Sequence, residues 1–311
     1  MEEEPISAKN TGWIQFVRNI NYFLLTHPFK GSSRLGSLVA KLLTPKPKGP
    51  TLVQTRHGFD IICMDPINDR GVERQLYLYG TYEAGTLSIM EKCLRKGDIF
   101  IDVGANIGLM SIFASQIVGS NGKIYSFEPE PETFAILKKN IEINKIENIY
   151  IYNFALGDKK SKAFIYTNPY AGRGSASLIK PVDQKDSKKY EVSIETLDDF
   201  ISTHDIKKVR MLKIDVEEWE LNVLKGADRL LKSSQAPIIS IEYSKFTQAK
   251  GGKLLDLYYY ILSINNYHIY KLKKGKEIPS RLVKIRNKID LPDHDNLFCF
   301  LPSHLKELNI C

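Results

Sequence analysis

The chain has 311 residues, 43% of them hydrophobic, with a formal net charge of +8 and a pI near 9.0. This length and apolar share suit one large globular domain, or a domain with an extension, and exclude a disordered or fibrous chain. The basic residues are dispersed and many stand beside acids, which indicates a solvated surface and argues against a nucleic-acid partner.

Cysteine usage and the lack of targeting signals predict a cytoplasmic protein. The four cysteines form no Cys-x-x-Cys pair and show no histidine spacing typical of zinc, so we expect free thiols and no metal site. The first residues, Met-Glu-Glu-Glu, lack the basic start and apolar centre of a signal peptide. No apolar run approaches the roughly twenty residues that a membrane span needs.

Two amphipathic helices are expected at the start of the chain. Apolar residues recur at helical spacing over residues 13–24 and again over residues 35–43, with a break at His27-Pro28. The proline-rich stretch 45–50 ends the pattern and is typical of a linker.

We therefore predict a helical extension over residues 1–50 and the main domain over residues 51–311. Lys and Arg stand on the polar faces of the two helices. The helices either pack on the main domain or make a peripheral contact, through residues 11–45, with a membrane surface or a lipid-linked substrate.

The next segments lead to the centre of the fold. Residues 51–65 predict a β-hairpin around His57-Gly58, and residues 72–83 a short helix followed by a loop. Residues 85–96 predict a helix, and Gly97-Asp98 is the turn before the first buried strand.

Residues 98–108 predict a buried strand that turns sharply into a helix. The apolar, partly β-branched run has no helical period and stops at Gly104, Asn106 and Gly108, which permit a tight turn. The helix that follows points free N–H groups at the turn. Such a unit opens a doubly wound sheet, whose ligands bind beyond the carboxyl ends of the strands.

The residues at this turn favour S-adenosylmethionine (SAM) over a dinucleotide. A dinucleotide fingerprint needs glycine where this chain has Asn106, because the pyrophosphate approaches the backbone there. SAM has no phosphate, and Asp102 at the strand end suits its ammonium and sulfonium charges. A second strand over residues 123–127 ends at Glu128, where such folds place an acid on the ribose hydroxyls. Taken singly, each feature also fits an ordinary turn or a solvated acid.

Beyond Glu128 the pattern alternates as in βαβ units, with an adenine-binding loop expected at residues 155–158. A polar insertion holding Gly172 and Gly174 is either a substrate lid or a surface loop. We predict an α/β fold with a doubly wound, mostly parallel sheet of seven strands, the last pair antiparallel. The remaining elements are helices at residues 132–144, 197–201 and 254–264, one helix ending at residue 231, and strands at 149–154, 162–167, 190–194, 209–214, 238–241, 267–272 and 296–301.

Four motifs together resemble those of the FkbM family of SAM-dependent methyltransferases. They are Asp102-Val-Gly-Ala-Asn-Ile-Gly108, Phe127-Glu-Pro129, Ala155-Leu-Gly-Asp158 and Leu212-Lys-Ile-Asp-Val-Glu217. The resemblance covers about residues 77–243 and implies a seven-stranded Rossmann-like fold, SAM as the cofactor, and O-methylation of small molecules, sugars or glycans.

The resemblance also implies which residues hold SAM. They are Asp102, Gly104, Ala105, Asn106, Gly108, Glu128, Pro129, Ala155, Leu156 and Asp158. The chain departs from the family at Glu218, where members usually have glycine. A charged side chain at this position reshapes the substrate pocket or adds a base.

A hydroxyl acceptor needs a base, or a metal that lowers its pKa, before it attacks a methyl group. The candidate catalytic residues are the acids expected on the rim of the crevice, Asp215, Glu217 and Glu242. A structural role is the alternative, with Asp215 holding loop N–H groups and Glu217 capping the next helix. Methylation of a base amine is not expected, because the chain lacks the Asn/Asp-Pro-Pro-aromatic segment at this strand end.

The sequence thus predicts a cytoplasmic SAM-dependent O-methyltransferase that acts on a hydroxyl of a saccharide, a lipid-linked glycan or another small metabolite. One rival is an NAD(P)-dependent oxidoreductase, against which Asn106 argues. The other rival is a binding protein that keeps a methyltransferase fold without turnover, which Glu218 leaves open.

Overall fold

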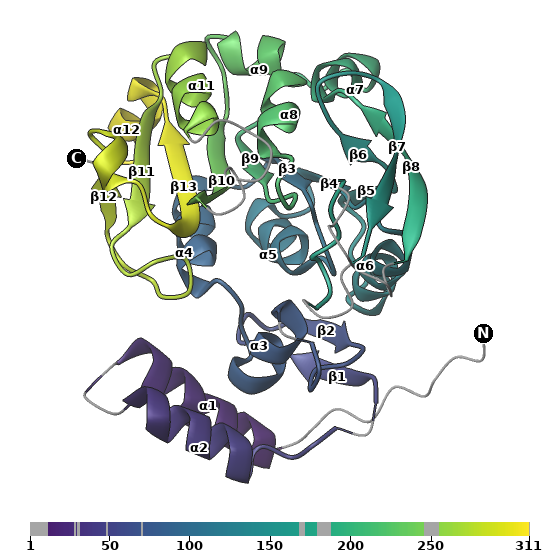
Figure 1. The fold of residues 1–311 in the computed structure, drawn as a ribbon, viewed down its shortest axis with the longest axis vertical. Helices are drawn as coiled ribbons and strands as arrows, with labels where there is room; N and C mark the ends of the chain where they lie inside the picture. The colour runs from purple at the N-terminus through teal and green to yellow at the C-terminus, as the bar shows by residue number, and fades with distance from the viewer. Residues whose placement is uncertain are drawn as a thin grey trace.

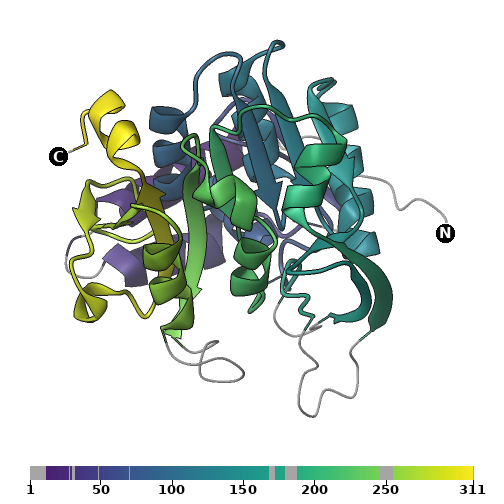
Figure 2. The same cartoon turned by 90° about the horizontal axis from the view of Figure 1, so that it is seen from above.

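The structure is a computed structural model that describes residues 12–27, 29, 32–47, 49–69, 71–167, 172–178, 188–245 and 255–310. An eight-stranded sheet lies between two layers of helices (Figures 1 and 2). Its strands are, in spatial order, β12 Leu282–Lys284, β11 His268–Leu272, β13 His294–Phe300, β10 Ile238–Ser244, β9 Met211–Ile214, β3 Ile99–Val103, β4 Lys123–Phe127 and β5 Ile149–Tyr152. Neighbours pair in parallel from β10 to β5 and antiparallel from β10 to β12.

The α/β class and the mostly parallel sheet are confirmed, but the predicted count of seven strands is wrong. The additional strand is β12, which pairs with β11 at the edge of the sheet. Only Leu282 and Val283 in it are apolar, and two such residues are too few to show a strand period.

Helices cover both faces of the sheet, and the alternation of strand residues decides which side chains meet which layer (Figure 1). Phe100 and Ile124 belong to one core cluster, whereas the next residues, Ile101 and Tyr125, belong to the other. One layer consists of α4 Ala84–Cys93, α5 Leu109–Val118 and α6 Pro131–Ile143, and the other of α7 Leu197–Thr203, α8 Glu220–Lys225, α9 Asp228–Lys232 and α11 Asp256–Ile264. The chain ends with η1 Lys288–Asp290 before β13 and α12 Pro302–Glu307 after it.

A second sheet of three strands adjoins the end of β5. It consists of β6 Ala155–Leu156, β8 Lys189–Glu195 and β7 Ser161–Tyr166, in that order. The predicted loop 155–158 therefore begins as a strand, because its backbone pairs in parallel with β8. The polar insertion leaves from β7 and returns at β8, and its described part is residues 172–178.

The amino-terminal elements lie at one end of the molecule, at the bottom of Figure 1. Two helices, α1 Trp13–Thr26 and α2 Ser32–Leu43, form an antiparallel pair, which we call the helical hairpin. The predicted β-hairpin is confirmed as β1 Thr51–Gln54 paired with β2 Asp60–Cys63. The short helix and following loop predicted over residues 72–83 are confirmed: the helix is α3 Val72–Tyr79, and Gly80 ends it in a left-handed conformation at φ 71°.

The helical hairpin packs on α3 through α1. Ile14 and Val17 are buried in this contact, and so are two polar residues, Arg18 and Asn21. Arg18 Nε donates to the carbonyl of Tyr77 at 2.7 Å, and Asn21 Nδ2 donates to the carbonyl of Leu78 at 3.2 Å. Of the two arrangements that the sequence left open, packing on the main domain is therefore present for α1, and polar side chains take part in it.

The predicted free thiols are confirmed where the structure describes them. Cys63, Cys93 and Cys299 are buried and unpaired, and Cys311 lies outside the described residues. Within the described ranges, no helix is long and apolar enough to cross a membrane. The same ranges contain no group of three or more His, Cys, Asp or Glu side chains placed to hold a metal ion.

Candidate functional site

The turn after β3 brings two strand ends into contact. Gly104 has φ +78°, and a Cβ at this position would lie 1.8 Å from the carbonyl oxygen of Asp215. The N–H groups of Gly104 and Ala105 both donate to the carbonyl of Phe127 at 3.0 Å. Glycine is therefore required at residue 104 for both conformation and space, and the turn closes the gap between β9 and β4.

Glu128 is held in place by the backbone of this turn. Its carboxylate accepts from Asn106 N and from Glu130 N, each at 2.9 Å. Burial raises the pKa of Glu128 to about 7, although the two N–H donors favour the charged form. Asn106 itself has φ +51°, and its side-chain oxygen is buried without a hydrogen-bond partner. Both side chains retain acceptor capacity at the turn.

A buried lysine links the ends of β3 and β9. Lys213 Nζ lies 3.4 Å from Asp102 Oδ1 and 3.4 Å from Asp215 Oδ2, because the parallel register places Lys213 beside Asp102. Burial alone lowers the pKa of Lys213, but the two carboxylates outweigh it and the pKa rises. Burial likewise works to raise the pKa of Asp215, yet Lys213 and Lys276 lower it. Asp102 also accepts from Ser111 Oγ at 2.6 Å.

More acids gather at the carboxyl ends of β9 and β10. Burial, with Glu242 and then Asp215 as like charges nearby, raises the pKa of Glu217 to about 8. Lys276 Nζ binds Glu242 at 2.7 Å and Glu83 at 2.9 Å. Glu217 makes no ion pair with any described residue. Its backbone has φ +42°, a sparsely populated conformation typical of functional sites.

These groups surround a cavity of about 430 Å³, a size that suits a small-molecule site. Ten predicted site residues line it: Gly104, Ala105, Asn106, Glu128, Pro129, Ala155, Leu156, Asp215, Glu217 and Glu242. Three others do not line it. Asp102 is buried behind the turn. Gly108, at the start of α5, lies against Leu137 of α6, and Asp158 is exposed beyond β6.

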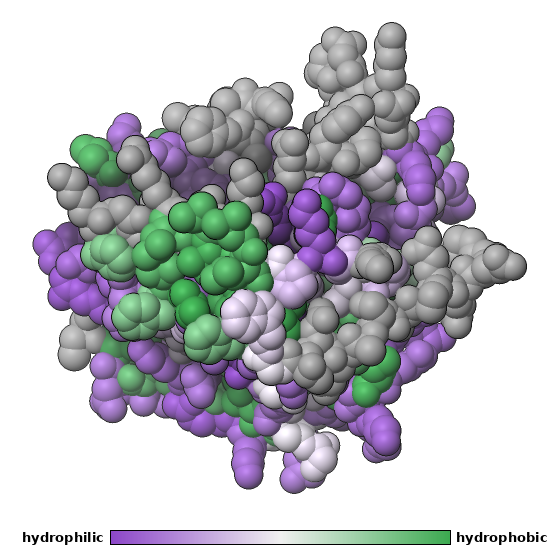
Figure 3. Space-filling view, turned by 90° about the horizontal axis from the view of Figure 1, so that it is seen from below, coloured by the Kyte–Doolittle hydropathy of each residue, from purple (hydrophilic) through white to green (hydrophobic). Residues whose placement is uncertain are grey.

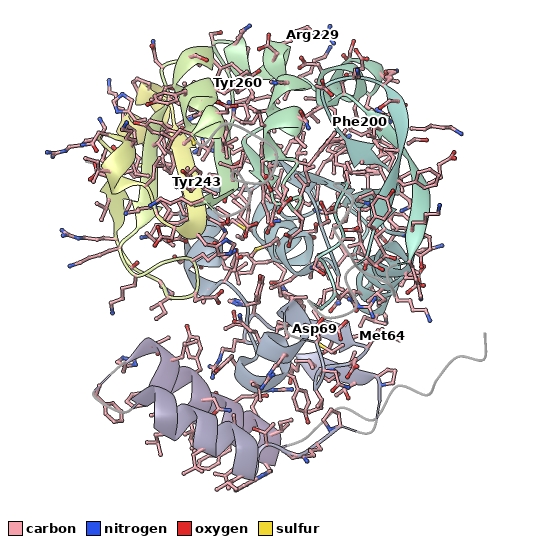
Figure 4. The ribbon with its side chains drawn as sticks, in the orientation of Figure 1. Met64, Asp69, Phe200, Arg229, Tyr243 and Tyr260 are labelled. Atoms are coloured by element: carbon pink, nitrogen blue, oxygen red, sulfur yellow. The ribbon has the colours of Figure 1, made fainter. Side chains whose placement is uncertain are left out.

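The polar insertion forms part of the cavity wall. Arg173 Nε pairs with the buried Glu73 of α3 at 2.7 Å, and Arg173 N donates to Asp69 at 2.8 Å. Asp69 lies between β2 and α3 (Figure 4). A Cβ on Gly174 would lie 2.1 Å from Asn106 Nδ2, so the insertion rests directly on the turn. Residues 172–178 are therefore a cover of the site and not a plain surface loop.

Sequence reasoning missed Lys213, Arg173 and Glu73. The sequence pattern could have identified Lys213. This lysine lies inside an apolar strand, on the same face as the acid two residues later, and a buried lysine requires a partner of opposite charge. Arg173 and Glu73 gave none, because they are 100 residues apart and meet only through the fold.

Comparison with known proteins shows that the chain is similar to methyltransferases. Residues 102–275 match the family described as the methyltransferase FkbM domain. The hexuronic acid methyltransferase AglP of Haloferax volcanii is 26% identical over 51% of this chain and 62% of its own length. The 31-O-demethyl-FK506 methyltransferase FkbM of Streptomyces tacrolimicus is 27% identical over 43% of this chain and 61% of its own length.

The matches are partial. The chain spans about 60% of the length of three of the curated relatives it matches. Among solved structures, a SAM-dependent O-methyltransferase of Thermotoga maritima is 14% identical, covers 82% of this chain and 94% of its own, and has a TM-score of 0.37.

Proposed function

Because the chain belongs to the FkbM methyltransferase family, we propose that it transfers a methyl group from SAM to a hydroxyl of a saccharide, a lipid-linked glycan or another small metabolite. The observation that carries the proposal is the pairing, in one cavity, of the nucleoside-type acid Glu128 with Glu217, a carboxyl whose pKa is about 8. The first is suited to bind and the second to accept a proton.

The residues present fit an adenosyl cofactor. Glu128 is fixed by two backbone N–H groups and lines the cavity, and the orphan Asn106 oxygen is an acceptor that a hydroxyl or amine donor would satisfy. Gly104 leaves the turn open to close approach. When bound, SAM supplies an electrophilic methyl group. Asp102 lies behind the turn and does not touch the cavity, and its ion pair with Lys213 holds that lysine beneath the turn.

Glu217 is proposed as the general base. A protonated hydroxyl is a poor nucleophile, and a carboxylate whose pKa lies near the working pH removes that proton efficiently. Burial near Asp215 and Glu242 is what keeps the basicity of Glu217 high. Glu242 does not share this role, because Lys276 holds it in an ion pair.

The choice of a hydroxyl acceptor rests on the relatives. AglP is described as acting on a hexuronic acid, and FkbM as acting at an oxygen of FK506. The first name gives a sugar acid as the acceptor and the second gives an oxygen atom as the methylated position, and both support the choice of an oxygen acceptor.

The test has two stages. Isothermal titration with SAM, S-adenosylhomocysteine and NADH is expected to show binding of the two adenosyl compounds alone. Labelled SAM with a panel of uronic acids and other saccharides is then expected to label an acceptor. Binding of NADH alone would support the oxidoreductase rival, and SAM binding without transfer to any acceptor would support the non-catalytic rival.

A matched pair of variants tests the base. Glu217→Gln is expected to lower kcat by roughly a hundredfold or more while SAM affinity stays within about twofold. Because Glu217 is protonated below about pH 8, wild-type kcat is expected to rise with pH through that value, and the variant to lose the rise. Glu218→Gln is the control, since the neighbouring Glu218 does not line the cavity. Equal losses in both variants would contradict the assignment.

A further inference from the structure

The outer face of the helical hairpin is apolar. Among the described residues, eight of the fifteen exposed large hydrophobic side chains lie between residues 13 and 43. Those on the two helices are Trp13, Phe16, Phe23, Leu35, Leu38, Leu42 and Leu43, each between 38% and 67% exposed. The space-filling view from this end of the molecule shows hydrophobic side chains gathered in one patch (Figure 3). Exposed apolar residues elsewhere are scattered, as on any soluble surface.

The two helices hold one another in this arrangement. Trp13 Nε1 donates to the carbonyl of Leu43 at 3.1 Å, which joins the start of α1 to the end of α2. The Trp13 and Phe16 rings lie 5.8 Å apart on the same stripe of α1. Gly36 of α2 stands close to Leu24, so the helices meet along small and aliphatic residues. The apolar face is therefore a defined surface.

Helix α1 is apolar on two sides, whereas the outward side of an ordinary surface helix is polar. Its inward side buries three apolar side chains, and it also holds Arg18 and Asn21, which donate to carbonyls at the end of α3. The three apolar residues are Ile14, Val17 and Leu24. Its outward side holds Trp13, Phe16 and Phe23. A helix that only needed to cover the core would have polar residues on its outward side. The contacts of Arg18 and Asn21 instead fix the aromatic side outward.

The charge of this segment indicates what covers the face. Residues 11–50 contain six basic residues and no Asp or Glu. The six are Arg18, Lys30, Arg34, Lys41, Lys46 and Lys48. Six positive charges in 40 residues are a large share of the net charge of +8 of the chain. Arg18 is buried against α3, so only the other five can supply the positive charge that is open to a partner. A segment that combines an apolar face with an excess of positive charge has the composition that binds an anionic lipid surface.

A second copy of the chain fits this face less well. A symmetric dimer places the same patch on both subunits, so two segments without any acid would meet and their positive charges would repel. A transmembrane role does not arise either, because α1 has 14 residues and a span needs roughly twenty. A helix of this kind lies in the plane of the membrane interface.

We propose that the helical hairpin docks the protein on an anionic membrane surface, with Trp13, Phe16, Phe23 and the α2 leucines at the boundary between headgroups and acyl chains. The proposal does not depend on the methyl-transfer reaction. Its failure would leave the proposed function standing, and the reverse also holds.

Vesicle flotation of the full chain tests the proposal. Vesicles of phosphatidylcholine with added phosphatidylglycerol are expected to carry the protein, and vesicles of phosphatidylcholine alone to carry much less. Rising salt is expected to weaken the binding, because the attraction between lysines and lipid headgroups is screened. Equal binding to both kinds of vesicle, unchanged by salt, would overturn the electrostatic part of the proposal.

A pair of double variants locates the binding surface. Phe16→Ser with Phe23→Ser removes two side chains that are each 55% exposed, and is expected to lower the partition coefficient by roughly tenfold or more. Leu262→Ser with Ile289→Ser removes exposed residues far along the chain, at 44% and 85%, and is expected to leave it within about twofold. Thermal melting of all variants checks the fold.

The remaining outcomes decide against the proposal. Equal losses of binding in both double variants would mean that the hairpin is not the docking surface. A wild-type dimer by light scattering that Phe16→Ser with Phe23→Ser converts to monomer, without vesicle binding by either form, would show that a second copy covers the face.

Discussion

The cavity at the strand ends and the outer face of the helical hairpin depart in opposite ways from the usual distribution of side chains. At the strand ends, charged groups such as Lys213, Asp102 and Glu128 are buried. On the hairpin, aromatic and leucine side chains are exposed. Charge is costly inside a protein and apolar area is costly outside it, so each departure needs a reason.

The two regions offset these free-energy costs in different ways. Buried charge at the site is paired, with Lys213 shared by two carboxylates and Lys276 by two more. Exposed apolar area on the hairpin has no partner within the described chain. A site that carries its own counter-charges is complete as a folded unit, whereas an apolar face without cover indicates a partner outside the chain, which we propose to be a membrane.

The largest expected effect concerns the buried charge at the site. Lys213→Met leaves Asp102 and Asp215 without their counter-charge, so the free energy of unfolding is expected to fall by about 3–5 kcal/mol in urea titrations. Lys245→Met is the control, because its pair with Asp293 is exposed to solvent and is expected to contribute little to stability. Adding Asp102→Asn to Lys213→Met is expected to restore part of the loss. A loss no larger than in the control would show that the buried network does not stabilise the strand ends.

The second prediction concerns the shape of the turn. Gly104→Ala puts a methyl group 1.8 Å from the Asp215 carbonyl oxygen and is expected to weaken SAM binding by roughly a hundredfold, measured by titration calorimetry. Gly97→Ala is matched to it, since Gly97 also has a positive φ, +85°, but nothing within 4 Å of the added carbon. If Gly104→Ala left SAM binding intact, the cofactor would have to bind away from the turn.

The third prediction uses the pH dependence of stability. Burial raises the pKa of Glu220 to about 8 from its ordinary value near 4.5, so the folded state holds this proton more tightly than the unfolded state. The stabilisation is present at low pH and is lost as pH rises through about 8. Glu220→Gln is expected to raise the unfolding free energy at high pH by about 2 kcal/mol and to change it little near pH 4. The exposed Glu142 gives a control substitution, and an identical pH profile in both variants would contradict the burial of Glu220.

The smallest effect separates the two sides of α1. Arg18→Met removes the donor to the Tyr77 carbonyl and is expected to cost about 1–2 kcal/mol in unfolding free energy. Phe23→Ser, one turn and a half further along on the outer side, is expected to change it by less than about 0.5 kcal/mol. A larger cost for Phe23→Ser than for Arg18→Met would show that the aromatic side, and not the polar side, packs on the protein.

The sequence predicted the parts of the site that rest on local chemistry. A strand that stops at Gly104 predicts a tight turn because only glycine readily adopts that φ, and Glu128 follows from its place at the end of the next strand. Asp215, Glu217 and Glu242 were predicted at the crevice because parallel strands deliver their last residues to one edge. Asp158 was misplaced, because residues 155–156 pair as a strand and carry the next residues out to the surface.

By itself, then, the chain determined the α/β pattern, the turn and the amphipathic character of its first helices, since each depends on spacing along a few residues. Only the tertiary structure decided that Lys213 stands beside Asp102, that Arg173 reaches Glu73, and that α1 turns Arg18 inward. The physical reason is that a period shows that a helix or strand has two faces, whereas the partner that covers each face is set by contacts between residues far apart in the chain.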